Sequence, residues 1–158
     1  PGLRFTLGVS TFVPKAQTPF QWQGVRPEAD KRLKRLAKRL KPKGIDLRPE
    51  SYGWSVIQAL LSRSDRRLAP VIAAVRGSQE SLGGWKKAYR AALANELPGA
   101  RSGGVDLPLP PPWEQVVHDN WNEDVVLPWD HLKGPLGQKT LLKHQSLSLA
   151  DAAPTVQD

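Results

Sequence analysis

The sequence contains no cysteine and no methionine. Without thiolates, the chain can form no disulfide framework, no cysteine nucleophile and no thiolate-bound zinc or iron–sulfur cluster. Its three histidines, His118, His131 and His144, stand 13 residues apart, whereas compact zinc sites use closely paired ligands. We therefore predict that this chain holds no metal and carries no cofactor of its own.

Long apolar runs and catalytic motifs are also missing. No run approaches the roughly 20 residues that span a bilayer, and residues 1–10 lack the basic and apolar regions of a secretory signal. There is no Walker loop, dinucleotide glycine fingerprint or Ser/His/Asp order. We expect a cytoplasmic chain that is no enzyme by itself and does not bind membranes. Because it starts at Pro1 without methionine, we expect an upstream part to be absent.

What the sequence has in excess is positive charge, and that charge is unevenly distributed. The formal net charge is +8, but residues 1–97 hold 19 Lys and Arg against 7 Asp and Glu, while residues 98–158 hold 4 against 8. The two halves could attract one another in the fold, or the basic half could face a polyanion. The charge distribution alone does not decide between these two explanations.

The N-terminal region reads as a strand followed by an ordered loop. Apolar and small or polar residues alternate over residues 4–13, which predicts a strand that Pro14 ends. Phe20 and Trp22 are expected to pin the following loop. A second short strand is predicted over residues 45–48, where it could cover an edge of the first strand; an edge left open invites self-association.

The rest of the chain is predicted to be helical. Apolar spacing, capping residues and helix breakers place helices at residues 27–41, 51–62, 66–76, 84–96, 113–121 and 137–149. Trp54 and Leu61 of the second helix are expected to face inward. Proline-rich residues 98–112 predict an extended strap, and residues 125–132 a second extended segment that Pro128 stops. The fold class is a mostly helical α+β chain, divided into segments 1–26, 27–97, 98–112 and 113–158.

The first helix carries a dense basic face. Eight Lys and Arg residues fall within residues 31–43, around an apolar stripe of Leu33, Leu36 and Leu40. Such a face could bind RNA by releasing counterions, but no aromatic residues are interleaved to stack on bases. A solvated amphipathic helix is the favoured interpretation, and nucleic-acid binding stays open as the alternative.

Three unusual words stand in a fixed order along the chain: STFVPKAQTPFQW (10–22), SRSDRRLAPVI (62–72) and LPWDHL (127–132). They resemble the end of the partial barrel and the following region of radical S-adenosylmethionine (radical SAM) proteins. The resemblance is to an uncharacterised subfamily with an N-terminal cobalamin-binding-like domain. GWKKAY (84–89) and LLKHQ (141–145) resemble that subfamily on either side of the third word.

The resemblance implies a parent enzyme with a [4Fe–4S] cluster on a Cys-x3-Cys-x2-Cys loop, S-adenosylmethionine as its cofactor and cobalamin as a further candidate. This chain would supply one or two strands at the end of the barrel and a helical C-terminal extension. The cluster loop would lie upstream. Phe12, Val13 and Pro14 match the positions that approach the adenine in the family, although residues of this type in a strand also serve as core.

Other candidates follow from residue chemistry. Lys15 and Thr18 could polarise a substrate at the barrel mouth, or form a Thr-Pro turn held by the hydroxyl group. Arg63, Arg66 and Arg67 could bind phosphate or carboxylate, or pair with Asp65, a predicted helix cap.

Three functions remain open at this point. The favoured one is an accessory part of a radical SAM enzyme that closes the barrel, shapes the substrate pocket and has the rest of the barrel as its partner. The second is a stand-alone module for RNA or another anion. The third is a protein-docking piece that uses the proline-rich strap and exposed tryptophans.

Overall fold

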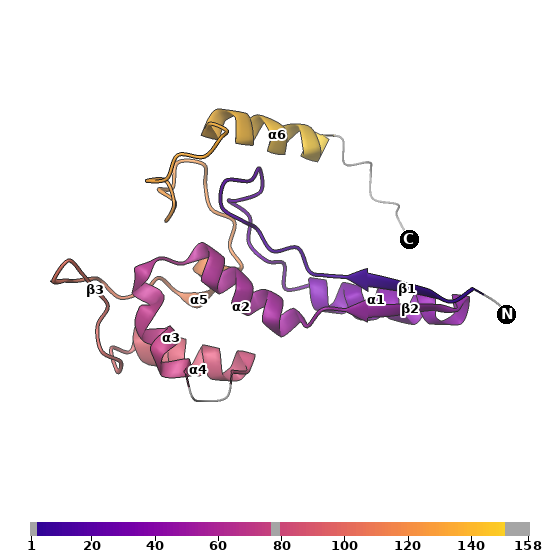
Figure 1. Cartoon of the computed structure of the whole chain (residues 1–158), viewed down its shortest axis with the longest axis horizontal. Helices are drawn as coiled ribbons and strands as arrows, with labels where there is room; N and C mark the ends of the chain where they lie inside the picture. The colour runs from indigo at the N-terminus through magenta and orange to yellow at the C-terminus, as the bar shows by residue number, and fades with distance from the viewer. Residues whose placement is uncertain (1–2, 77–79, 151–158) are drawn as a thin grey trace.

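The computed structural model describes residues 3–76 and 80–150, and over this range the chain is a mostly helical α+β fold, as predicted (Figure 1). The N-terminal strands and helix project from a group of packed helices. The elements in chain order are β1 (Phe5–Val9), α1 (Ala29–Leu40), η1 (Lys41–Lys43), β2 (Ile45–Pro49), α2 (Tyr52–Arg63), η2 (Arg66–Leu68), α3 (Ala69–Val75), α4 (Leu82–Leu93), β3 (Arg101–Ser102), β4 (Val105–Asp106), α5 (Trp113–Val117) and α6 (Gln138–Ala150).

The first three elements form a strand–helix–strand unit. β1 and β2 pair in parallel, with Phe5 opposite Ile45 and Leu7 opposite Leu47, and α1 connects them. The apolar stripe of α1 is only half-buried, and the helix contacts β2 more than β1. The predicted short second strand, and its pairing with the first, are confirmed.

β1 is shorter than predicted and poorly covered. The prediction of a strand over residues 4–13 was wrong at its end. The Glu50 N–H still donates to the Val9 carbonyl at 3.0 Å, but the chain after β2 then enters α2 at Tyr52 and offers β1 no further residues to pair with. In the described part of the chain, β1 pairs only with β2, so its other edge carries no strand. Phe5 and Leu7 are 59% and 43% exposed.

The main core lies among the helices. It joins α2, α3, α4 and α5 with Val25 of the N-terminal loop; its fully buried members include Val25, Ala59, Leu60, Val71 and Val117. Trp54 and Leu61 are 53% and 47% exposed, contrary to prediction, because α2 packs through other positions against α4 and α5. Pro70 stands in the first turn of α3, so that helix begins late, after η2, and keeps its backbone bonds.

A second, smaller core joins the two ends of the described chain. It consists of Trp22, Leu127, Trp129 and Leu141. Residues 128–131 form a turn that begins at Pro128, where the predicted extended segment was expected to stop. The Asp130 carboxylate supports this turn by accepting a hydrogen bond from the Leu127 N–H at 2.7 Å. α5 ends at Val117, earlier than predicted.

The predicted proline-rich strap contains a small antiparallel hairpin. β3 and β4 pair through Arg101 and Asp106, and Gly103 and Gly104 turn the chain with φ of +56° and +82°. These angles favour glycine, which has no Cβ atom to clash in this conformation. No helix in the described residues is long and apolar enough to cross a membrane.

Candidate functional site

The residues after β1 differ sharply in exposure. The Phe12 ring is 57% exposed and meets Phe20 edge-on, with 5.8 Å between ring centroids. Val13 packs against the helical core and Pro14 is fully buried. Of the three predicted adenine-contacting positions, therefore, Phe12 alone offers a side-chain face to a ligand.

A hollow of about 190 Å³ adjoins Phe12 between the end of β1 and the start of α1. It is lined by Thr11, Phe12, Gln23, Gly24, Arg26, Ala29 and Arg32. The Thr11 hydroxyl is buried there without a hydrogen-bond partner in the described chain. The carboxyl end of a parallel strand is where ligands bind in open α/β sheets. The hollow combines one aromatic face, two guanidinium groups and a free hydroxyl.

Lys15 and Thr18 form a turn. The Thr18 hydroxyl donates to the Lys15 carbonyl at 2.7 Å, which confirms the hydroxyl-supported turn as the local structure. The Lys15 side chain is exposed to solvent. Neither residue lines the hollow beside Phe12.

The arginines of the second word diverge in space. Asp65 caps η2 by accepting from the Arg67 N–H at 2.9 Å, which confirms the predicted cap. Its carboxylate also holds the Arg67 side chain, with the Asp65 Oδ2 to Arg67 Nη2 distance at 2.7 Å. Arg66 instead contacts the Ser102 hydroxyl in β3. Arg66 and Arg67 thus do not converge on one anion.

Arg63 is the most deeply buried charged residue described, with 1% of its surface exposed. It donates to the carbonyls of Val117 at 3.3 Å and Asp119 at 3.0 Å. Its guanidinium lies 3.9 Å from the Trp121 ring centroid, a cation–π contact. Burial lowers the pKa of Arg63 to about 10, against a weaker opposing effect of the Asp119 charge. Sequence reasoning placed Arg63 beside Asp65 and missed this role.

The first of the three words that carry the resemblance contacts each of the other two. Gln21 of the first word is buried, and its side-chain oxygen accepts from Trp129 Nε1 of the third word at 2.7 Å. The Ser62 hydroxyl of the second word donates to the Pro14 carbonyl of the first at 3.4 Å. Neither contact was predicted from the sequence, because the residues that form them stand far apart along the chain.

No group of three or more His, Cys, Asp or Glu residues in the described ranges could hold a metal ion. Comparison with family models, with curated proteins and with solved structures finds no match to the chain. The candidate site therefore rests on its own geometry and on the three words.

The Asp65–Arg67 pair predicts a pH-dependent loss of stability. Partial burial acts to raise the pKa of Asp65, but the hydrogen bonds from Arg67 outweigh it and the pKa lies below its usual value. When the pKa of a carboxyl group is lower in the folded than in the unfolded protein, its ionised form stabilises the fold. This stabilisation is fully present at pH values above the unfolded-state pKa and is lost as the pH falls through the folded-state pKa. We expect Asp65→Asn to be less stable than the parent at pH 7.

Urea unfolding of both proteins between pH 7 and pH 2 measures this difference. The two unfolding free energies should converge as the pH falls below the range in which carboxyl groups titrate. A difference that stays constant over the whole range would show that the carboxylate charge of Asp65 is not the cause.

Proposed function

We propose that this chain is the C-terminal accessory portion of a radical SAM enzyme, which closes the barrel and shapes its substrate pocket without being catalytic alone. The proposal includes a cytoplasmic location and the remainder of the barrel as the partner. The [4Fe–4S] cluster does not fit this chain, because there are no thiolates to hold it. Its ligands belong to the upstream part.

The uncovered parallel strand pair carries the proposal. Parallel sheets occur almost only where both faces are covered, and isolated pairs of strands are marginal in water. Here β1 has no strand on its second edge in the described chain, and Phe5 and Leu7 are exposed. A further parallel strand would pair with the open edge of β1, and the helix that accompanies it would cover the Phe5 and Leu7 side chains. That is what the end of a larger barrel requires.

The contacts among the three words support the same proposal. They hold the loop after β1 against the helical extension, through Gln21 to Trp129 and Ser62 to Pro14. The extension thereby fixes where Phe12 stands at the carboxyl end of the strand. In an assembled barrel, the exposed Phe12 ring would offer a flat apolar surface to an adenine base.

The reading frame upstream of residue 1 tests the proposal most directly. We expect it to encode a Cys-x3-Cys-x2-Cys loop within a few hundred residues. A frame without such a loop would overturn the radical SAM assignment.

The barrel-closing role is tested separately, with the upstream region and this chain produced as two polypeptides. We expect them to co-purify, and the double change Phe5→Lys with Leu7→Lys to abolish the association. Val105→Lys, which changes another exposed apolar residue on the distant hairpin, is the matched control and should associate normally. If the cluster loop exists but the double variant still associates, β1 is not the barrel edge.

Anaerobic reconstitution of this chain alone with iron and sulfide is expected to give no cluster and no cleavage of S-adenosylmethionine. Such clusters need thiolate ligands, and the chain has none. Visible absorbance and bound iron measure the outcome. Stoichiometric iron with a charge-transfer band would contradict the expectation.

The basic face of α1 keeps the nucleic-acid alternative testable. No residue of α1 is buried, and its basic side chains face solvent. We expect the change of Lys34, Lys38 and Arg39 together to Gln to alter the unfolding free energy by no more than about 1 kcal/mol, because exposed charges contribute little. Salt-sensitive, submicromolar RNA binding by the parent that the triple variant loses would favour the alternative.

A further inference from the structure

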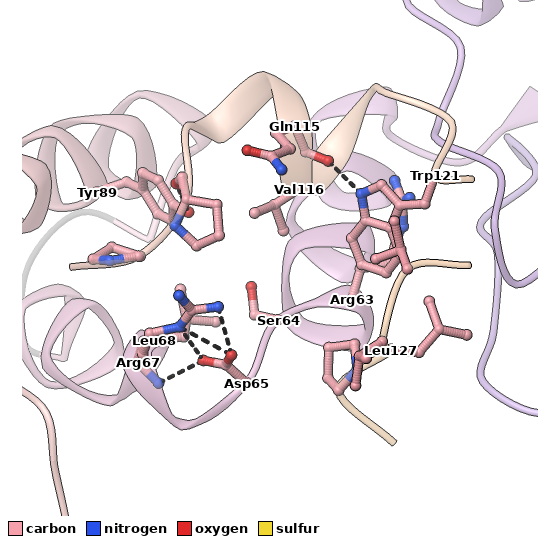
Figure 2. Close-up of a pocket in the computed structure, with 15 residues that line it drawn as sticks. Arg63, Ser64, Asp65, Arg67, Leu68, Tyr89, Gln115, Val116, Trp121 and Leu127 are labelled. Atoms are coloured by element: carbon pink, nitrogen blue, oxygen red, sulfur yellow. Dashed lines mark hydrogen bonds and ion pairs between the residues drawn. The ribbon is translucent and has the colours of Figure 1, made fainter. Parts of the chain in front are cut away.

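A cavity of about 330 Å³ lies in the helical part of the molecule, apart from β1 and the hollow beside Phe12 (Figure 2). The end of α2, η2, α4, the proline-rich strap, α5 and the loop before Trp129 all contribute to it. Its lining includes Arg63, Ser64, Arg67, Gln115, Val116 and Trp121.

Positive charge exceeds negative charge around this cavity. Arg63 and Arg67 line the cavity together with one carboxylate, that of Asp65, which pairs with Arg67. The Asp119 charge acts on Arg63 from outside the lining. Within the described residues, the contacts of Arg63 are two main-chain carbonyls and the Trp121 ring, so its charge is hydrogen-bonded there without an ion pair. An anion in the cavity would offset that buried charge.

Three donors in the cavity wall remain available. The Ser64 hydroxyl and the Gln115 side-chain amide make no hydrogen bond within the described residues, and Figure 2 shows the Ser64 hydroxyl directed toward the space between Arg67 and Val116. Asp65 holds Arg67 through Nε and Nη2, whereas Arg67 Nη1 has only a weak contact with the Leu109 carbonyl at 3.5 Å. A guanidinium fixed in this way loses little freedom when it binds an anion.

The remaining walls are apolar. Val116, Leu68 and Leu127 are buried side chains at the cavity surface, and Trp121 adds an aromatic wall. Val126 stands at the rim and is 84% exposed. A few convergent polar groups in a largely apolar concavity are typical of small-molecule sites.

We propose that this cavity binds a small ligand with an apolar or aromatic body and one carboxylate or phosphate group. The anionic group meets Arg67, Ser64 and Gln115, and the body lies against Val116 and Leu127. This inference does not depend on the barrel assignment, since none of these residues belongs to the strand–helix–strand unit.

The test is an NMR titration of the whole chain with phenyl phosphate and, separately, with benzoate. Benzyl alcohol is the uncharged control. We expect saturable shifts at the Ser64 and Gln115 amides and the Trp121 indole N–H, with a dissociation constant on the order of 1 mM for at least one anion. Comparison of the two anions tells which head group the cavity prefers. Equal binding of benzyl alcohol, or shifts confined to the basic face of α1, would overturn the proposal.

Two variants and one control sharpen the test. Arg67→Gln is expected to weaken binding about tenfold, since it removes a charge-assisted donor. Gln115→Leu removes an exposed donor without touching the Asp65 pair, and it should weaken binding even if Arg67→Gln proves unstable. Arg66→Gln changes the adjacent guanidinium, which does not line the cavity, and should bind within about twofold of the parent. Equal loss in the Arg66 and Arg67 variants, or no loss in Gln115→Leu, would contradict the assigned site.

Discussion

Replacing Gly24 with alanine is expected to lower the unfolding free energy by about 3 kcal/mol or more, enough to unfold a large fraction of a marginal domain. A Cβ atom at this position would overlap the main-chain carbonyl of His118, which cannot move aside as a flexible side chain could. Residues 24–25 and residues 117–120 also form hydrogen bonds next to this overlap. Val25 N–H donates to the Val117 carbonyl at 2.9 Å, and Gly24 N–H donates to Asn120 Oδ1 at 3.0 Å. Urea unfolding followed by far-UV circular dichroism measures the loss.

Gly8→Ala is the matched control for this prediction. Gly8 lies in β1, and an added Cβ would meet no atom within 4 Å. We expect its unfolding free energy to stay within about 1 kcal/mol of the parent. Equal stability of the two alanine variants would show that residues 24–25 do not pack against residues 117–118 in solution.

Replacing Arg63 with methionine is expected to cost about 3 kcal/mol. Methionine fills much of the same volume, but the carbonyls of Val117 and Asp119 lose their buried donor, and each unsatisfied group costs about 1–3 kcal/mol. The Trp121 ring also loses the cation above its face. The effect appears in the urea midpoint and in near-UV circular dichroism of the tryptophans.

The corresponding control is Arg66→Met, three residues along the chain. Arg66 lies at the surface, where it contacts the Ser102 hydroxyl, so this variant should lose no more than about 1 kcal/mol. Buried charges are sometimes replaced by apolar residues without loss. If Arg63→Met is as stable as the parent, the buried guanidinium contributes nothing to folding and serves only the cavity that it lines.

Local patterns were sufficient to predict most of the secondary structure. The stripe of Leu33, Leu36 and Leu40 predicted α1, and the Asp65 cap fixed the start of η2. Capping and periodicity depend on neighbours within one or two helical turns, which the sequence displays directly. Trp54 and Leu61 were misplaced, because the face that α2 buries is decided by α4 and α5, whose positions no local pattern contains.

The candidate sites depend on contacts that only the fold reveals. The sequence pointed to Phe12 and to the second word, and the structure places Phe12 beside a hollow and Arg67 beside a cavity. Trp121 and Gln115 carried no motif, and they reach the cavity because α5 packs on α2. Arg63 meets its carbonyl acceptors across 54 and 56 residues, beyond the range of any periodicity argument.

The bond between Gln21 and Trp129 spans 108 residues of the chain, and this has a consequence for the order of folding during synthesis. Helices need only nearby residues, and the β1–β2 pair needs residues up to Pro49, so both can form early as the chain leaves the ribosome. The loop after β1 cannot reach its folded conformation until Trp129 has been synthesised. Its residues Gln21 and Trp22 contact residues from the last quarter of the described chain. In the proposed full-length enzyme, the barrel mouth would therefore be completed last, after nearly all of the extension has been made.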